Sequence, residues 1–336
     1  MVKGSKLEEE IFKSEFDFEK TALHIFQFQA KENSVYKSYL EQLKINPQKI
    51  NSVIQIPFLP IQFFKTHKIV SGAQQKTGNQ EPGTIFISSG TTGSERSKNY
   101  VADLKIYEQS FIKCFELFYG NIDEYCLLVL LPSYSNDASL IYMASELIKR
   151  TKKSMSGFYL NDFEKLNSTI QELINQEKKF IVLGVTYSLL DYADRKKSEN
   201  VGFNGHGIVM ETGGMKGKRN EMLREEIHNT LCKAFDVKQI HSEYGMTEIL
   251  SQAYSKGEGI FHCPPWMKIF IRDVNDPNSF IENGRTGGIN IIDLANIYSC
   301  SFLATQDLGK KYDDGSFEIL GRFDESDLRG CNLMIE

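Results

Sequence analysis

The chain has 336 residues, of which 41% are hydrophobic and 25% charged, as in ordinary folded globular proteins. This composition excludes a disordered or collagen-like chain, and the length fits one large α/β domain or two ordinary ones. The 39 basic and 44 acidic residues give a net charge of −5, so no basic excess indicates nucleic acid or a membrane surface as a partner.

Apolar stretches and cysteines indicate where the chain resides. The longest apolar run, Tyr125 to Leu131, has seven residues, whereas a membrane-spanning helix needs about 20. The first residues, MVKGSKLEEE, lack the apolar core of a secretory signal. The six cysteines form no CxxC pair. We therefore expect a cytoplasmic protein without a membrane span, with reduced thiols and without a zinc site.

The predicted elements begin with a helix over 7–30, where apolar residues recur every three or four positions. Short apolar strands then alternate with longer helices. Strands are predicted at 84–88, 125–131, 180–185, 207–211, 269–272, 288–293 and 317–320, and helices at 103–119, 138–150, 162–176 and 217–234. This alternation predicts a mostly parallel sheet layered with helices, and the strand-rich pattern after residue 255 predicts a second, more antiparallel sheet.

The segment SSGTTGS, residues 88–94, directly follows the first of these strands. Its glycines let the backbone approach a ligand closely, and its hydroxyls and backbone N–H groups suit an anion. A Walker A loop is excluded, because GxxxxGK[ST] is absent. Taken alone, the segment is equally consistent with a turn rich in serine, threonine and glycine.

Two further segments carry charged residues beside glycines. In YGMTE, residues 244–248, Glu248 is suited to Mg²⁺, which favours carboxylate oxygens, although a solvated glutamate after a capped strand fits equally. In TQDLG, residues 305–309, Asp307 is expected at a strand end, where it can accept ribose hydroxyls. In GRFDE, Arg322 follows another strand and supplies a cation with five donors. The alternative is two hairpins joined by a surface ion pair.

In this order, SSGTTGS, YGMTE, TQDLG and GRFDE resemble the core motifs of the adenylate-forming superfamily of acyl-CoA synthetases, peptide-synthetase adenylation domains and luciferases. The resemblance covers 84–330 and implies an α/β fold like their large N-terminal domain, with ATP and Mg²⁺ as cofactors and a carboxylic acid as substrate. It implies the following nucleotide contacts: Ser89, Gly90, Thr91, Thr92 and Gly93 at the phosphates, Gly213, Gly214, Tyr244 and Gly245 at the adenine, Asp307 at the ribose, Thr247 at a phosphate, and Glu248 on Mg²⁺. Arg322 is implied as a catalytic cation, with a hinge at Asp324.

Two features depart from that superfamily's pattern. A Pro-Lys pair usually follows the last glycine of the phosphate loop, but Ser94-Glu95-Arg96-Ser97-Lys98 stands here, so Arg96 or Lys98 is expected to serve instead. The sequence also ends twelve residues after Asp324, which implies that the usual C-terminal domain with its catalytic lysine is absent.

The short tail is similar to that of the LuxE-type acyl-protein synthetases, which place an acyl-accepting cysteine near the C-terminus. Cys331 resembles that cysteine, and Pro57-Phe58-Leu59-Pro60-Ile61 also resembles this branch. The resemblance implies that a fatty acid is activated as an acyl adenylate and transferred to Cys331. An acyl-accepting partner protein, a reductase or a carrier protein, would receive it next. The alternative for Cys331 is a packing residue in a terminal strand.

The expected organisation is a helical and loop region over 1–83, an adenylate-forming catalytic core over 84–323 and a hinge with a short tail over 324–336. Two other functions remain open from the sequence. One is a carboxylate ligase that charges CoA or a carrier-protein phosphopantetheine directly. The other is a non-catalytic subunit that binds nucleotide or acyl adenylate.

Overall fold

The computed structural model describes residues 4–13, 15–72, 83–89, 95–132, 137–196, 202–203, 205–213 and 222–323. They fall into two compact units, one within 1–82 and 265–336 and the other within 83–264. One boundary between the units lies between Pro82 and Gly83. Residues 265–323, by contrast, cluster with the N-terminal region and not with the segment that precedes them.

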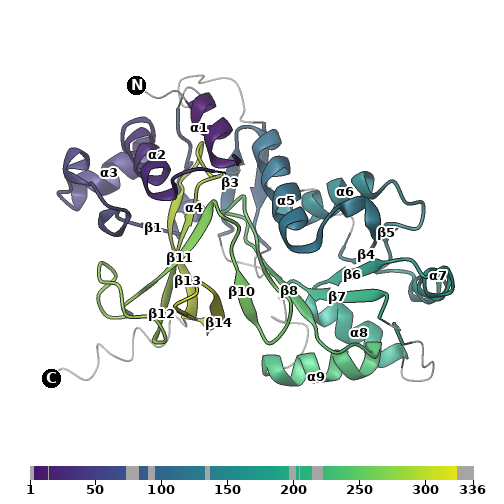
Figure 1. The fold of residues 1–336 in the computed structure, drawn as a ribbon. Coiled ribbons are helices and arrows are strands. Elements are labelled where there is room, and N and C mark those ends of the chain that lie inside the picture. Colours follow the sequence, from purple (N-terminus) through teal and green to yellow (C-terminus); the bar gives the residue numbers. More distant parts are fainter. Residues whose placement is uncertain are drawn as a thin grey trace. The chain divides into compact units, whose positions relative to one another are not determined.

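The second unit contains a mostly parallel sheet with the strand order β10-β9-β8-β7-β6-β4-β5 (Figure 1). Strand β8 pairs in parallel with β7, and β9 and β10 add antiparallel strands beyond it. The strands are β4 (Cys126–Leu130), β5 (Gly157–Phe158), β6 (Phe180–Gly184), β7 (Gly207–Glu211), β8 (His241–Tyr244), β9 (Ala253–Ser255) and β10 (Ile260–His262). The predicted parallel sheet is therefore confirmed.

Helices cover both faces of this sheet, which explains its unbroken apolar strands. Every residue of β4 and β6 is buried, as expected for strands covered on both sides. One core cluster joins these strands to α7 (Phe163–Asn175), α8 (Thr186–Lys196) and α9 (Arg224–Phe235). Figure 1 shows α5 (Leu104–Tyr119) and α6 (Ser139–Thr151) on the other side of the strands from α8 and α9. A separate antiparallel hairpin is formed by β2 (Thr84–Ile87) and β3 (Lys98–Val101).

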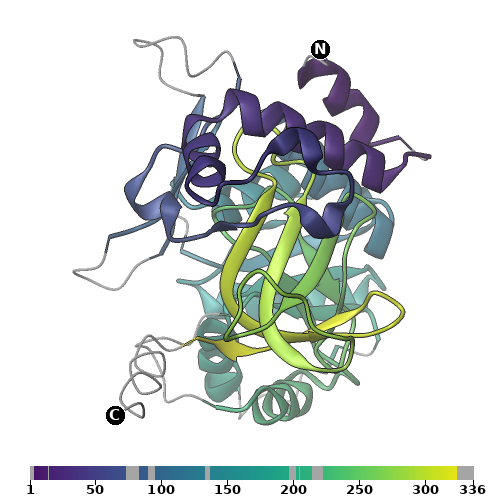
Figure 2. The ribbon, with the colours of Figure 1, turned by 90° about the vertical axis from the view of Figure 1, so that its left-hand side faces the viewer.

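The first unit combines N-terminal helices with four antiparallel strands (Figure 2), so the antiparallel pairing predicted after residue 255 is confirmed, but not its assignment to a separate sheet. Its strands are β11 (Met267–Arg272), β12 (Thr286–Asp293), β13 (Phe302–Lys311) and β14 (Phe317–Arg322), and β1 (Leu59–Pro60) pairs in parallel with β13. Its helices are α1 (Gly4–Ile11), α2 (Phe18–Glu32), α3 (Ser34–Gln42) and α4 (Phe63–Thr66). The helix predicted over 7–30 is two helices, because Asp17 accepts the Lys20 N–H and starts α2.

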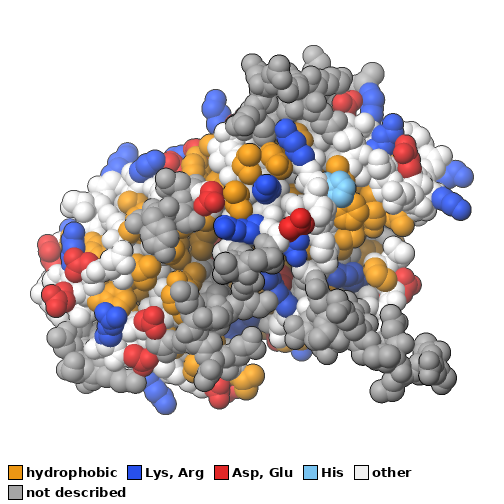
Figure 3. Space-filling view, turned by 180° about the vertical axis from the view of Figure 1, so that it is seen from behind, with side chains coloured by type: hydrophobic (Ala, Val, Ile, Leu, Met, Phe, Trp, Pro, Cys, Tyr) orange, Lys and Arg blue, Asp and Glu red, His pale blue; other side chains and the backbone are white. Residues whose placement is uncertain are grey.

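The surface carries both charge signs. On the face shown in Figure 3, lysine and arginine side chains occur among aspartates and glutamates. Among the described helices, none is long and apolar enough to cross a membrane.

Candidate active site

The hairpin of β2 and β3 carries the segment SSGTTGS at its tip. Ser88 and Ser97 close the base of this loop, since the Ser88 N–H donates to the Ser97 carbonyl at 3.0 Å and the Ser97 N–H donates to Ser88 Oγ at 2.9 Å. Ser89, Arg96 and Lys98 are exposed. Gly90, Thr91, Thr92 and Gly93 lie outside the described residues. The described residues on either side of this segment thus lead into two paired strands.

The YGMTE segment leaves β8 at Tyr244 and turns at once. The Met246 carbonyl accepts the Ile249 N–H at 3.3 Å, which places Thr247 and Glu248 at the central positions of a β-turn. The Glu248 side chain is buried, with 7% of its surface exposed. The alternative of a solvated glutamate at this position is therefore wrong.

Gly245 makes room for a buried acid that the sequence did not single out. A Cβ atom at Gly245 would lie 2.4 Å from Oε1 of Glu243. Glu243 is buried on β8, and burial, with a smaller contribution from the charge of Glu211, raises the pKa of its carboxyl to about 8. The carboxyl is thus mostly protonated at neutral pH.

Glu211, at the end of β7, organises the turn that contains the predicted glycine pair. Its Oε2 accepts Thr186 Oγ1 at 2.7 Å and the Gly213 N–H at 2.6 Å. Burial alone would raise the pKa of Glu211, but the neighbouring side chains of His228 and Ser242, followed by Thr186 and the Gly213 N–H, outweigh it and lower the pKa to about 2. Gly213 has a φ of +72°, a conformation that favours glycine. Gly214 lies outside the described residues.

Unsatisfied polar atoms gather in this same unit. Six buried side-chain atoms in the described part of the chain have no hydrogen-bond partner, and all lie within 83–264: Asn99 Oδ1, Ser188 Oγ, Thr212 Oγ1, His228 Nε2, Ser242 Oγ and Gln252 Oε1. Ser242 is the register partner of Glu211, and Thr212 directly follows it. Buried polar groups are normally paired, so Thr212 Oγ1, next to Glu211, can still make a hydrogen bond to a further polar partner.

Asp307 and Arg322 lie together in the first unit. They are register partners on β13 and β14, and Arg322 Nε donates to Asp307 Oδ1 at 2.9 Å. The expectation that Asp307 lies at a strand end is wrong, since it lies inside β13. The predicted ion pair is present, although Asp307 itself is buried.

A buried arginine beneath Asp307 was missed by the sequence analysis. Arg272 donates to the backbone carbonyls of Ile289 at 2.9 Å and Thr305 at 2.6 Å. Burial lowers the pKa of Arg272 to about 10, while the nearby Asp307 charge acts in the opposite direction. A Cβ at Gly288 would lie 2.5 Å from its Cζ, so glycine there leaves space for the guanidinium. No local pattern in the sequence signals this arginine.

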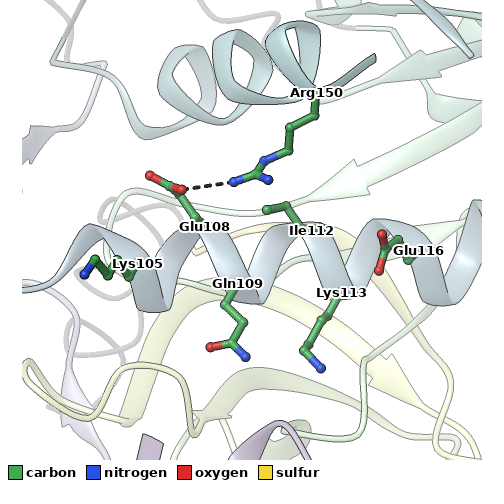
Figure 4. A pocket seen from close by; sticks show the side chains of 7 residues that line it. All are labelled: Lys105, Glu108, Gln109, Ile112, Lys113, Glu116 and Arg150. Carbon is green, nitrogen blue, oxygen red and sulfur yellow. Dashed lines mark hydrogen bonds and ion pairs between the residues drawn. The ribbon is translucent and has the colours of Figure 1, made fainter. Parts of the chain in front are cut away.

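A surface groove runs along α5 (Figure 4), and it contains none of the predicted site residues. It is lined by Lys105, Glu108, Gln109, Ile112, Lys113, Glu116 and Arg150. Arg150 and Glu108 pair across it at 3.1 Å. We assign it no role in catalysis.

The carboxylates near the turn after β8 suit Mg²⁺ better than a metal ion that takes all of its ligands from protein side chains. No group of three or more His, Cys, Asp or Glu side chains suited to a metal occurs in the described residues. Mg²⁺ is commonly bound through one or two carboxylates together with phosphate and water oxygens. Glu248, buried at the turn after β8, can supply one such carboxylate.

The fold is that of adenylate-forming enzymes. The protein-family model described as acyl-protein synthetase, LuxE, matches residues 7–336, and the chain belongs to this family. No curated protein sequence matches the chain.

Solved structures of adenylate-forming enzymes share the fold. ATP-bound MatB from Rhodopseudomonas palustris is 18% identical with a TM-score of 0.53, and the match covers 71% of this chain and 47% of MatB. An open conformation of 2-hydroxyisobutyryl-CoA ligase with 2-HIB-AMP and CoA is 12% identical with a TM-score of 0.67, covering 91% and 70%. The long-chain-fatty-acid-CoA ligase FadD1 from Archaeoglobus fulgidus is 12% identical with a TM-score of 0.52, covering 74% and 53%. The chain thus spans about half the length of MatB.

Proposed function

We propose that this protein activates a carboxylic acid, most simply a fatty acid, with MgATP and transfers the acyl group to a thiol. In the first step a carboxylate oxygen attacks the α-phosphorus of ATP, the bond to the β-phosphate oxygen breaks, and pyrophosphate leaves. In the second step a thiolate attacks the carbonyl carbon of the acyl adenylate, and AMP leaves with the bonding electrons. The products are a thioester, AMP and pyrophosphate.

The buried Glu248 carboxylate in the turn after β8 is the observation that carries the first step. A carboxylate is already ionised at pH 7, so this step needs alignment and charge neutralisation and no general base. Glu248 is a buried carboxylate next to Thr247, on a turn that follows the strand of Tyr244. We assign Glu248 to the metal and Thr247 to a phosphate. When bound, Mg²⁺ would neutralise phosphate charge.

The remaining nucleotide contacts are assigned by the motifs. The loop from Ser89 to Gly93 is proposed to hold the β- and γ-phosphates through hydroxyl and N–H groups. Gly213, Gly214, Tyr244 and Gly245 are proposed at the adenine, and Asp307 at the ribose hydroxyls. Arg322 is proposed as the cation that supports charge at the reacting phosphate. The solved 2-hydroxyisobutyryl-CoA ligase structure, which contains an acyl adenylate, supports this chemistry for the fold.

Cys331 is the proposed first acyl acceptor, and a partner protein is proposed to receive the acyl group from it. This cysteine lies outside the described residues. It lies seven positions after Asp324, a span of up to about 25 Å when extended. Arg329, two residues before it, would favour the thiolate form of the cysteine.

A second candidate acceptor is CoA or the phosphopantetheine arm of a carrier protein. The 2-hydroxyisobutyryl-CoA ligase structure, which contains CoA, matches 91% of this chain and favours that alternative. In that case Cys331 would not carry the acyl group.

Carboxylate-dependent exchange of pyrophosphate into ATP tests the first step for either acceptor. We expect exchange with at least one acid from a panel of short aromatic to long-chain acids, and its loss in Glu248→Gln. Glu225→Gln is the matched control, because Glu225 is exposed on α9 in the same unit. Absence of exchange with every acid would contradict the proposal, as would equal exchange in Glu248→Gln and the wild type.

A further inference from the structure

Asn99 is a fully buried polar residue on the hairpin that carries the phosphate loop. It lies on β3 two residues after Ser97, which closes the base of that loop, and pairs in register with Phe86. Its side chain has no exposed surface. Burying an amide costs free energy unless its donors and acceptors are satisfied, so each of its polar atoms requires a partner.

The amide of Asn99 donates to the turn that carries Glu248. Nδ2 lies 2.9 Å from the Thr247 carbonyl oxygen, across 148 positions of the sequence. This carbonyl belongs to the peptide between Thr247 and Glu248, which is the central peptide of the β-turn closed by Met246 and Ile249. The hydrogen bond from Asn99 Nδ2 therefore holds the orientation of the Thr247–Glu248 peptide. The orientation of this peptide determines where the side chains of Thr247 and Glu248 point.

Rotation of that central peptide would convert one turn type into another. A type II turn requires a positive φ at its second central residue, the position of Glu248. Neither Thr247 nor Glu248 has a positive φ, so the turn is not of type II. The Asn99 hydrogen bond stabilises the observed turn against the type II turn, because a rotated peptide would direct the Thr247 carbonyl away from Nδ2.

The oxygen of the Asn99 side-chain amide differs from its nitrogen. Oδ1 is buried and has no hydrogen-bond partner in the part of the chain that the structure describes. An amide oxygen can accept two hydrogen bonds, and leaving it unpaired in the interior costs free energy. Proteins keep such an unpaired buried group mainly at functional sites, which favours a functional reason for Asn99 beside this turn.

We propose that Asn99 is a positioning residue for adenylate formation, which couples the phosphate-loop hairpin to the turn of Thr247 and Glu248. Both segments belong to the same compact unit. Asn99 itself touches neither substrate nor metal in this proposal. It sets the direction of the Glu248 carboxylate and the Thr247 hydroxyl relative to the loop base at Ser88 and Ser97. The inference rests on the proposed function for the roles of Thr247 and Glu248.

Asn99→Asp is the test variant, because it keeps the size and Oδ1 but removes the Nδ2 donor. Asn33→Asp is the matched control. Asn33 is also fully buried, and its Nδ2 donates to the Ser299 carbonyl at 3.0 Å and to Ser71 Oγ at 3.1 Å, within the other unit. Asn99→Leu, which has the same heavy-atom branching, avoids a buried charge and serves if Asn99→Asp does not fold.

The first readout is pyrophosphate exchange at a saturating acid concentration, with Mg²⁺ and ATP varied. We expect both Asn99 variants to lose roughly tenfold or more in kcat and to need more Mg²⁺ for half-maximal rate. Asn33→Asp should lower the melting temperature without changing the Mg²⁺ requirement. Asn99 variants that lose stability but keep the wild-type kcat and Mg²⁺ requirement would show a purely structural role and overturn the inference.

The second readout does not depend on the reaction. Hydrogen exchange of the ligand-free protein reports whether Asn99 holds the turn. We expect faster exchange over 245–250 in the Asn99 variants than in the wild type or in Asn33→Asp. Unchanged exchange there would overturn the inference. If the wild type shows no pyrophosphate exchange, the proposed function fails, and faster turn exchange would still support the coupling of Asn99 to the turn.

Discussion

Asp307 and Arg322 face each other on neighbouring antiparallel strands, with Arg322 Nε 2.9 Å from Asp307 Oδ1. Their environments differ, since the side chain of Asp307 is 7% exposed and that of Arg322 is 62% exposed. The carboxylate is therefore held in place by the strand, while the arginine reaches it from the solvent side. Such a pair holds the carboxylate in place, so the ribose contact that we propose for Asp307 would not carry the entropic cost of ordering it on binding.

Asp307→Asn tests the ribose assignment. The amide can still accept from Arg322 but no longer supplies the charge beside the buried Arg272. We expect the KM for ATP to rise roughly tenfold and the unfolding free energy to fall by about 1–3 kcal/mol. The control is Glu318→Gln, because Glu318 faces Lys310 at 3.7 Å on the same two strands. An ATP KM in Asp307→Asn equal to that of Glu318→Gln would contradict the assignment.

Gly245→Ala tests why glycine stands between β8 and the turn of Met246 to Ile249. The added Cβ would lie 2.4 Å from Glu243 Oε1, so the buried carboxyl or the turn must move. We expect a loss of about 1–3 kcal/mol in stability and a larger loss of pyrophosphate exchange. Gly157→Ala in the same unit is the control, because its Cβ would find only an ordinary contact with Tyr159 at 3.8 Å. Equal melting temperatures in the two variants would contradict this explanation.

Glu243 predicts a pH dependence of stability. Its pKa is raised in the folded protein from 4.5 to about 8, so the folded state holds the proton more tightly than the unfolded chain. The stability that this proton contributes is fully present below about pH 4.5 and is lost as the pH rises through 8. We expect Glu243→Gln to flatten this decline.

Chemical denaturation between pH 5 and 8.5 measures this effect. Glu225→Gln is the control, since Glu225 is exposed on α9. Stability curves for Glu243→Gln and the wild type that run parallel over this interval would show that the Glu243 carboxyl does not titrate as described.

Helices and strands were predictable from the sequence where the pattern of apolar residues matches the pattern of buried positions. Elements with polar residues at buried positions were not. The apolar runs of β4 and β6 and the helices α5, α6 and α7 lie close to their predicted positions. Strand β13 was missed, because its buried positions include the polar residues Thr305 and Asp307. A polar buried face reverses the usual alternation, so no two-residue hydrophobic period is visible.

The site was predictable only as far as its motifs are contiguous. The glycine and hydroxyl pattern at residues 88–94 and the YGMTE segment are local and were read directly. Asn99, Glu211 and Glu243 were not, because their roles depend on partners distant in the chain. Asn99 meets Thr247 only when β3 packs near the turn after β8, and no spacing in the sequence encodes that contact.

Intact mass spectrometry tests the central claim, acyl transfer from an adenylate to a protein thiol. The protein is incubated with MgATP and the acid panel beside Cys331→Ser and the control Cys232→Ser, whose thiol pKa is raised by burial. We predict a hydroxylamine-sensitive mass increase of one acyl group in the wild type and Cys232→Ser, and none in Cys331→Ser. Pyrophosphate release without any protein adduct, or an adduct of equal yield in Cys331→Ser, would contradict transfer to Cys331.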